Sequence, residues 1–160
     1  MKTLVKASAV SILISLGSPA WAQAVEVQGA WARATVPGQK ATGAYMILTA
    51  ATGAKLISAS SPAAGAVEVH EMKMEGDIMR MRALPLGLEL PAGRAVDLAP
   101  GGYHIMLMDL KGALAKDSVV PLTLWFKDAK GVESRLELKL PVAARASGAT
   151  ANPAAHEHKH

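Results

Sequence analysis

Histidine and methionine side chains alternate along one short segment of this chain, and their chemistry suits a soft metal ion. In the segment Gly-Gly-Tyr-His-Ile-Met-Leu-Met, residues 101–108, the side chains of His104, Met106 and Met108 alternate with apolar ones. Alternate residues of a β-strand point to the same face, so one imidazole and up to two thioethers would project together. Among first-row metal ions, Cu(I) is the one that this pair of ligand types suits best. The segment therefore predicts a copper site.

Further donors of the same kind lie upstream. His70 lies on another alternating segment, and Met79 and Met81 share one face of a third. The chain has no cysteine, so thiolate sites, blue-copper centres and disulfides are excluded. Neutral imidazole and thioether ligands favour holding and transferring Cu(I) over redox cycling.

The alternative is that these methionines fill the hydrophobic core, as methionine commonly does. Six methionines and both histidines outside the C-terminal tail lie within residues 70–108, and this clustering favours ligands. On this alternative Met46, Met106 and Met108 would all lie in the core, and Met108 is expected there in either case. Met72 and Met74 are expected at the surface, because their charged neighbours are typical of a solvated loop.

Residues 1–22 predict a secretory signal peptide. Lys2 and Lys6 precede an apolar stretch, and small residues before Ala22 form a cleavage site, although cleavage after Ala24 also fits the pattern. The sequence offers no cysteine for lipid attachment, and no later apolar run is long enough to span a membrane. We therefore expect an exported, periplasmic protein without a membrane span.

Residues 23–144 predict one all-β domain. Short alternating or apolar segments are separated by glycine and proline, and no segment keeps a helical period. The expected strands are residues 25–31, 43–49, 55–60, 66–72, 78–82, 86–90, 95–98, 103–109, 120–127 and 133–142. The link over residues 128–131 predicts a hairpin, and residues 111–118 a loop or a helical turn. This pattern favours an antiparallel β-sandwich or barrel.

Charge and motifs argue against several function classes. The net charge is +4, of which Lys2 and Lys6 contribute two. The sequence contains no dense basic patch with interleaved aromatic residues, so we do not expect nucleic-acid binding. Trp31, Trp125 and Phe126 are expected in the core. No nucleophile elbow or phosphate loop is found, so we do not expect an enzyme.

Residues 145–160 predict a disordered tail of small and polar residues. It ends in His156, His158 and His160, which alternate with charged residues and could form a second site suited to Cu(II). The alternatives are a solvated tail without function and a purification tag, but the interrupting Glu and Lys argue against a tag.

The spacing of His70, Met81 and His104-x-Met106 resembles the His…Met…His-x-Met signature of the PCu(A)C family of periplasmic copper chaperones. The resemblance covers nearly all of residues 25–142. It is carried by residues 30–34, 43–46, 79–82, 100–107 and 120–124.

The resemblance implies a cupredoxin-like β-sandwich that binds one Cu(I) through His70, Met81, His104 and Met106, with Met79 as an alternate ligand. It also implies delivery of copper to the CuA centre of cytochrome c oxidase, directly or through another copper chaperone. A protein that buffers copper for resistance would use the same ligands, and a copper-dependent oxidoreductase is a further alternative. A secreted interaction module would bind no copper.

We expect a monomeric, non-enzymatic carrier. Handover by ligand exchange requires the ion to lie near the surface, so we expect His104 and Met106 to be at least partly reachable at one edge of the sandwich.

Overall fold

The computed structural model of the protein describes residues 25–144, which form ten β-strands. Their bounds are β1 (Val25–Arg33), β2 (Ala41–Ala50), β3 (Ala54–Ser60), β4 (Ala64–Glu75), β5 (Ile78–Ala83), β6 (Leu88–Leu90), β7 (Ala95–Leu98), β8 (His104–Leu110), β9 (Val119–Asp128) and β10 (Glu133–Ala143). No helix that could cross a membrane occurs in this part of the chain. The predicted signal peptide (residues 1–22) and tail (residues 145–160) lie outside the described residues.

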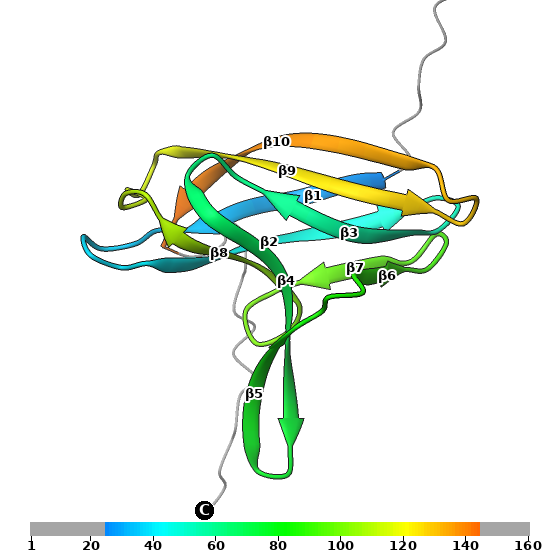
Figure 1. The fold of residues 1–160 in the computed structure, drawn as a ribbon, viewed down its shortest axis with the longest axis horizontal. Helices are drawn as coiled ribbons and strands as arrows, with labels where there is room; N and C mark the ends of the chain where they lie inside the picture. Colours follow the sequence, from blue (N-terminus) through cyan, green and yellow to red (C-terminus); the bar gives the residue numbers. More distant parts are fainter. Residues whose placement is uncertain (1–24, 145–160) are drawn as a thin grey trace, which may run out of the picture.

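The strands pack as two layers of a cupredoxin-like sandwich, and Figure 1 shows β9 and β10 of one layer above β2 and β8 of the other. One layer has the order β5-β4-β8-β2-β1, with β7 also paired to β2, and the other has the order β10-β9-β3-β6. Neighbouring strands are antiparallel, except that β1 and β10 run parallel where they join the layers. The all-β prediction is confirmed, every expected strand is present, and residues 111–118 form a loop.

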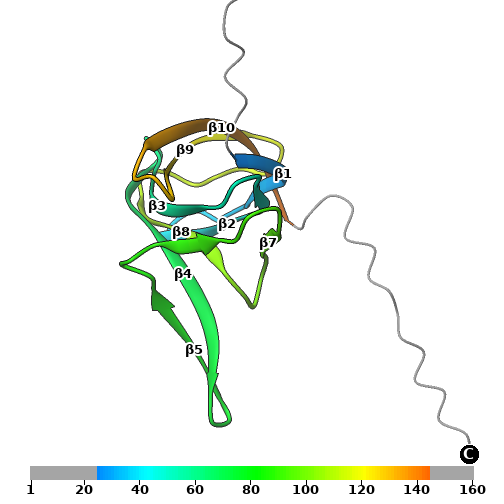
Figure 2. The same ribbon diagram turned by 90° about the vertical axis from the view of Figure 1, so that its right-hand side faces the viewer.

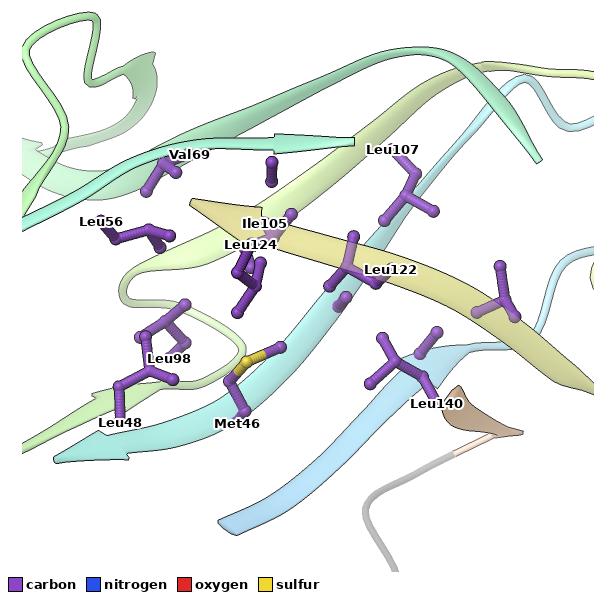
Figure 3. Packing of buried hydrophobic residues seen from close by; sticks show 14 of the residues in the cluster. Met46, Leu48, Leu56, Val69, Leu98, Ile105, Leu107, Leu122, Leu124 and Leu140 are labelled. Carbon is purple, nitrogen blue, oxygen red and sulfur yellow. The ribbon is translucent and has the colours of Figure 1, made fainter. Parts of the chain in front are cut away.

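The core lies between the layers, and on strands such as β8 and β9 it is built by alternate side chains. On β8, Ile105 and Leu107 have no exposed surface, while their neighbours in sequence point to the other face. Figure 3 shows these side chains meeting Leu122 and Leu124 of β9 from the opposite layer. Met46 lies in this core, as expected.

The aromatic residues are buried to different extents. Phe126 is a core residue, as expected. Trp31 is also buried, but it packs outside the main hydrophobic cluster. Trp125 is only half-buried, because it alternates with Leu124 and Phe126 and so points away from the core.

The β4–β5 hairpin projects beyond the sandwich, as Figure 2 shows. β4 pairs with β8 only as far as His70, where β8 begins, and continues to Glu75 with β5 as its partner. The two-residue turn places Gly76 at φ +64°, the position that a type II′ turn gives to glycine. The loop expected around Met72 and Met74 is therefore a strand, because the alternation of thioethers and charges there is itself a two-faced strand pattern.

Candidate metal centre

The four predicted ligands lie on the outer face of one layer, opposite the core. In the pairing of β4 with β8, His70 stands directly across from His104. In the pairing of β4 with β5, Met72 stands across from Met81. Residues that face each other across antiparallel strands point to the same side, so the hairpin extends the face that begins at His104.

A direct contact joins His104 and Met81. The Nε2 atom of His104 lies 3.1 Å from the Sδ atom of Met81, and its Nδ1 atom lies 3.1 Å from the carbonyl oxygen of Gly102. We assign the proton to Nδ1, which donates to that carbonyl, so the Nε2 lone pair faces the thioether. The Gly102 carbonyl also accepts the backbone N–H of Met72 at 3.1 Å, which ties the hairpin to the start of β8.

His70 presents a free nitrogen beside His104. The two imidazole centroids are 5.7 Å apart at an interplanar angle of 73°. Nε2 of His70 lies 2.8 Å from a carboxylate oxygen of Glu68, whereas its Nδ1 atom is buried and has no hydrogen-bond partner among residues 25–144. A carboxylate that accepts one N–H of a histidine leaves the other nitrogen available to a metal ion. A buried nitrogen without a hydrogen-bond partner needs an explanation, and a lone pair kept available for a metal ion is one.

Met106 and Met81 open onto a surface cavity of about 340 Å³, which Met72 and His104 also line. Met106 is half-buried, and Met81 is 49% exposed. The expectation that His104 itself is partly reachable holds only through this cavity, because the residue is just 6% exposed. Of the four predicted ligands, Met81 on the hairpin is the most exposed.

Burial lowers the pKa of His104 below its ordinary value of 6.5. The neighbouring His70 and Arg33 lower it further, against the opposing effect of the hydrogen bond to Gly102. His104 is therefore neutral near pH 7, the state in which imidazole binds metal ions.

An aromatic row supports the imidazole from the side. Trp31 packs on Tyr45 with ring centroids 4.8 Å apart, and Tyr45 lies 6.5 Å from the ring of His104. The Arg33 guanidinium lies over the Tyr45 ring, 5.4 Å from its centroid. Gly43 lets the tyrosine lie along its own strand, because a Cβ there would collide with the phenol.

Sequence analysis missed four residues around the site. Tyr45 and Arg33 line the cavity, Glu68 holds His70, and Met72 lies opposite Met81. Met72 and Glu68 share the parity of His70 on β4, and this signal was available in the sequence. The positions of Tyr45 and Arg33 depend on which strands pair.

Two candidate methionines lie away from the central contact. Met79 pairs with Met74 nearer the hairpin tip, so it is not next to His104. Met108 is half-buried at the other end of the face, opposite Ala41 and Ala66, and the expectation that it is core is wrong.

The described residues hold no group of three His, Asp or Glu suited to a metal ion, so a site here depends on thioethers. His156, His158 and His160 lie outside these residues.

Comparison with known proteins gives the family. Residues 25–142 match the family described as "Putative lipoprotein LpqE-like". The chain belongs to the LpqE-like family. The chain is 36% identical over 107 residues to "Putative lipoprotein Lxx21020" of Leifsonia xyli subsp. xyli, a match that covers 67% of this chain and 64% of that protein. The match thus spans less than two thirds of the relative's length.

The LpqE-like domain has the fold of solved PCuAC domains. It superimposes with a TM-score of 0.59 on the copper-bound PCuAC domain from PmoF2, at 23% identity and covering 77% of this chain and 95% of that one. It superimposes with a TM-score of 0.57 on the solution structure of apo-DR1885 from Deinococcus radiodurans, at 28% identity and covering 91% and 95%. These similarities support the fold predicted by the resemblance to PCu(A)C.

Proposed function

We propose that this LpqE-like protein is an exported copper carrier that binds one Cu(I) ion through His70, Met81, His104 and Met106. The observation that carries the proposal is the contact of 3.1 Å between Nε2 of His104 and Sδ of Met81, two lone-pair donors that face each other beside a cavity. The unpartnered Nδ1 of His70 supports the same reading.

The donor set favours Cu(I) as the cargo. Two thioethers and two neutral imidazoles are soft to borderline ligands, and thioethers disfavour Cu(II). A site that prefers one oxidation state suits storage and transfer, and this preference argues against a copper-dependent oxidoreductase. The copper-bound PCuAC domain of PmoF2 shares the fold, which agrees with this choice of metal.

Transfer would proceed by ligand exchange at the hairpin side of the site. Met81 is the most exposed of the four ligands, so an acceptor's ligand can replace it while the histidines still hold the ion.

The acceptor that we propose is the CuA centre of cytochrome c oxidase, directly or through another copper chaperone, in the periplasm. A protein that buffers copper for resistance would use the same residues. Gene deletion separates the two, since lost oxidase assembly indicates delivery and copper sensitivity with normal oxidase indicates buffering.

The proposed Cu(I) site of the domain is tested by anaerobic competition for Cu(I) against a chromophoric chelator. The exported chain is used with His156, His158 and His160 replaced by Ala, so that only the domain is measured. One equivalent of tightly bound Cu(I) is expected, and His104→Ala with Met106→Leu should abolish it. Met108→Leu is the matched control and should bind normally. Equal binding by the ligand variant and its parent would refute the proposed site.

The tail is proposed as a separate site for Cu(II). The intact chain should bind Cu(II) more tightly than the chain with the three tail histidines replaced, while both bind Cu(I) equally. Equal Cu(II) binding by the two chains would leave the tail without a metal role.

A further inference from the structure

The β4–β5 hairpin has one face of thioethers and one face of charges. Cross-strand pairing places Met72 opposite Met81 and Met74 opposite Met79 on the face that continues from His104. The other face carries the ion pairs Arg82–Glu71 and Arg80–Glu75, the second at 3.1 Å, together with Lys73 and Ile78. The hairpin thus separates its neutral sulfur atoms from its charged groups.

Core packing does not explain these methionines. Met74 is 54% exposed and Met79 is 47% exposed, on a hairpin that projects away from the sandwich (Figure 2). An exposed thioether contributes little hydrophobic stabilisation. Burial therefore does not account for two exposed methionines that lie directly opposite each other on paired strands.

The geometry allows both sulfurs to contact one ion. Side chains directly opposite each other on antiparallel strands have Cβ atoms about 4.5–5.5 Å apart. Each thioether has three rotatable bonds, so both sulfur atoms can turn towards a point between the strands. Two thioethers form a neutral, soft donor pair that suits Cu(I) and not the hard cations.

We propose that Met74 and Met79 form a second, outer Cu(I) site, which the Met72–Met81 pair joins to the His104 site. With only two thioether ligands, this outer site binds more weakly than the inner one. If the outer site passes copper on to His104, that role rests on the proposed carrier function. Binding of Cu(I) at Met74 and Met79 is independent of the carrier function, and it can be measured separately.

The experiment follows the methionine methyl signals by NMR during an anaerobic titration with Cu(I). The full exported chain carries 13C-labelled methionine methyl groups, and its three tail histidines are replaced by Ala. The first equivalent should shift the methyl signals of Met81 and Met106. Further Cu(I) should shift those of Met74 and Met79.

The variant Met74→Leu with Met79→Leu should keep the first shifts and the one-to-one affinity, and should lose the second binding step. Leucine preserves the apolar surface and volume, and both positions are exposed, so the fold is not expected to change. Met108→Leu is the matched control, since Met108 lies on the same face but at the far end, and it should keep both steps.

The outcomes separate the two proposals. If Met74 and Met79 do not shift in excess Cu(I), the outer site is refuted whatever the inner ligands do. If they shift while Met81 and Met106 do not, the outer site stands and the proposed carrier site fails. Loss of the second step in Met108→Leu as well would show a nonspecific effect and would also refute the outer site.

Discussion

Glu68 determines which nitrogen of His70 is free to bind an ion. Its carboxylate lies 2.8 Å from Nε2, and this contact leaves the buried Nδ1 without a partner. We predict that Glu68→Gln lowers the affinity for Cu(I) by about 10–100-fold, the usual effect of losing a carboxylate that orients a histidine ligand. Competition against the chromophoric chelator measures the change.

Glu137→Gln is the matched control for this variant. Glu137 is an exposed residue of β10, and among the described residues its only ion pair is with Arg135. The affinity of Glu137→Gln should equal that of the parent. An unchanged affinity in Glu68→Gln would show that Glu68 does not orient His70.

His104 makes the stability of the copper-free protein depend on pH. Its pKa in the folded protein is lowered by burial, so between that pKa and 6.5 the unfolded chain binds more protons than the folded one. The contribution of His104 is therefore fully present above pH 6.5 and is lost as the pH falls towards the folded-state pKa.

We predict that the free energy of unfolding of the copper-free protein falls less on acidification in His104→Gln than in the parent. Urea denaturation from about pH 8 to about pH 5 spans the range in which histidine titrates. Parallel pH profiles for the two proteins would contradict the lowered pKa.

The alternation of His104, Met106 and Ile105 was readable from the sequence, because side-chain direction in a strand is a local property. The contact of His104 with Met81 was implied only by the resemblance to PCu(A)C, since it depends on the registers in which β4 pairs with β5 and β8. Glu68 was missed because a single acidic residue on a strand does not reveal its hydrogen-bond partner, and its contact with His70 is seen only in the structure.

The β4–β5 hairpin is the element on which the site depends most. It carries Met81, and its turn depends on Gly76, whose φ of +64° is disfavoured for other residues. We predict that Gly76→Ala costs the hairpin about 1–2 kcal/mol. The affinity for Cu(I) should fall, while the midpoint of global unfolding changes little. Amide hydrogen exchange in β5 and chelator competition measure the two effects.

Gly93→Ala is the control for backbone strain alone. Gly93 has φ +67° in the turn between β6 and β7, and a Cβ there would meet no other atom within 4 Å. This variant carries the same strain away from the site, so its copper affinity should not change. A comparable loss of affinity in Gly93→Ala would contradict a specific role for the hairpin.

Charged residues made the outer end of β4, beyond residue 72, look like a loop in the sequence. Glu71 and Lys73 suggested a loop, but they alternate with Met72 and Met74, and this alternation fits a strand with two solvent-facing sides. Such a strand lacks the hydrophobic face that normally marks one, so its length depends on pairing with β5.

At the scale of the whole molecule, the sequence predicted all ten strands but not their order. Alternation and turn residues act locally, whereas the parallel contact of β1 with β10 and the neighbours of β8 join segments far apart in the chain. The half-buried position of Trp125 follows from the same limit. On β9 the core face is the one that carries Leu122, Leu124 and Phe126, and Trp125 lies on the opposite face.

The β8 side of the site is anchored in the core, whereas the β4–β5 hairpin on the other side projects from it. Behind His104 and Met106, Ile105 and Leu107 anchor β8 in the core with no exposed surface, whereas β5 is the only described strand that pairs with the outer half of β4. Local opening of a protein requires far less free energy at such an unsupported element than unfolding of the core. The residence time of a bound ion would then be set by brief departures of the hairpin. Strong equilibrium binding and rapid release are therefore compatible in this molecule.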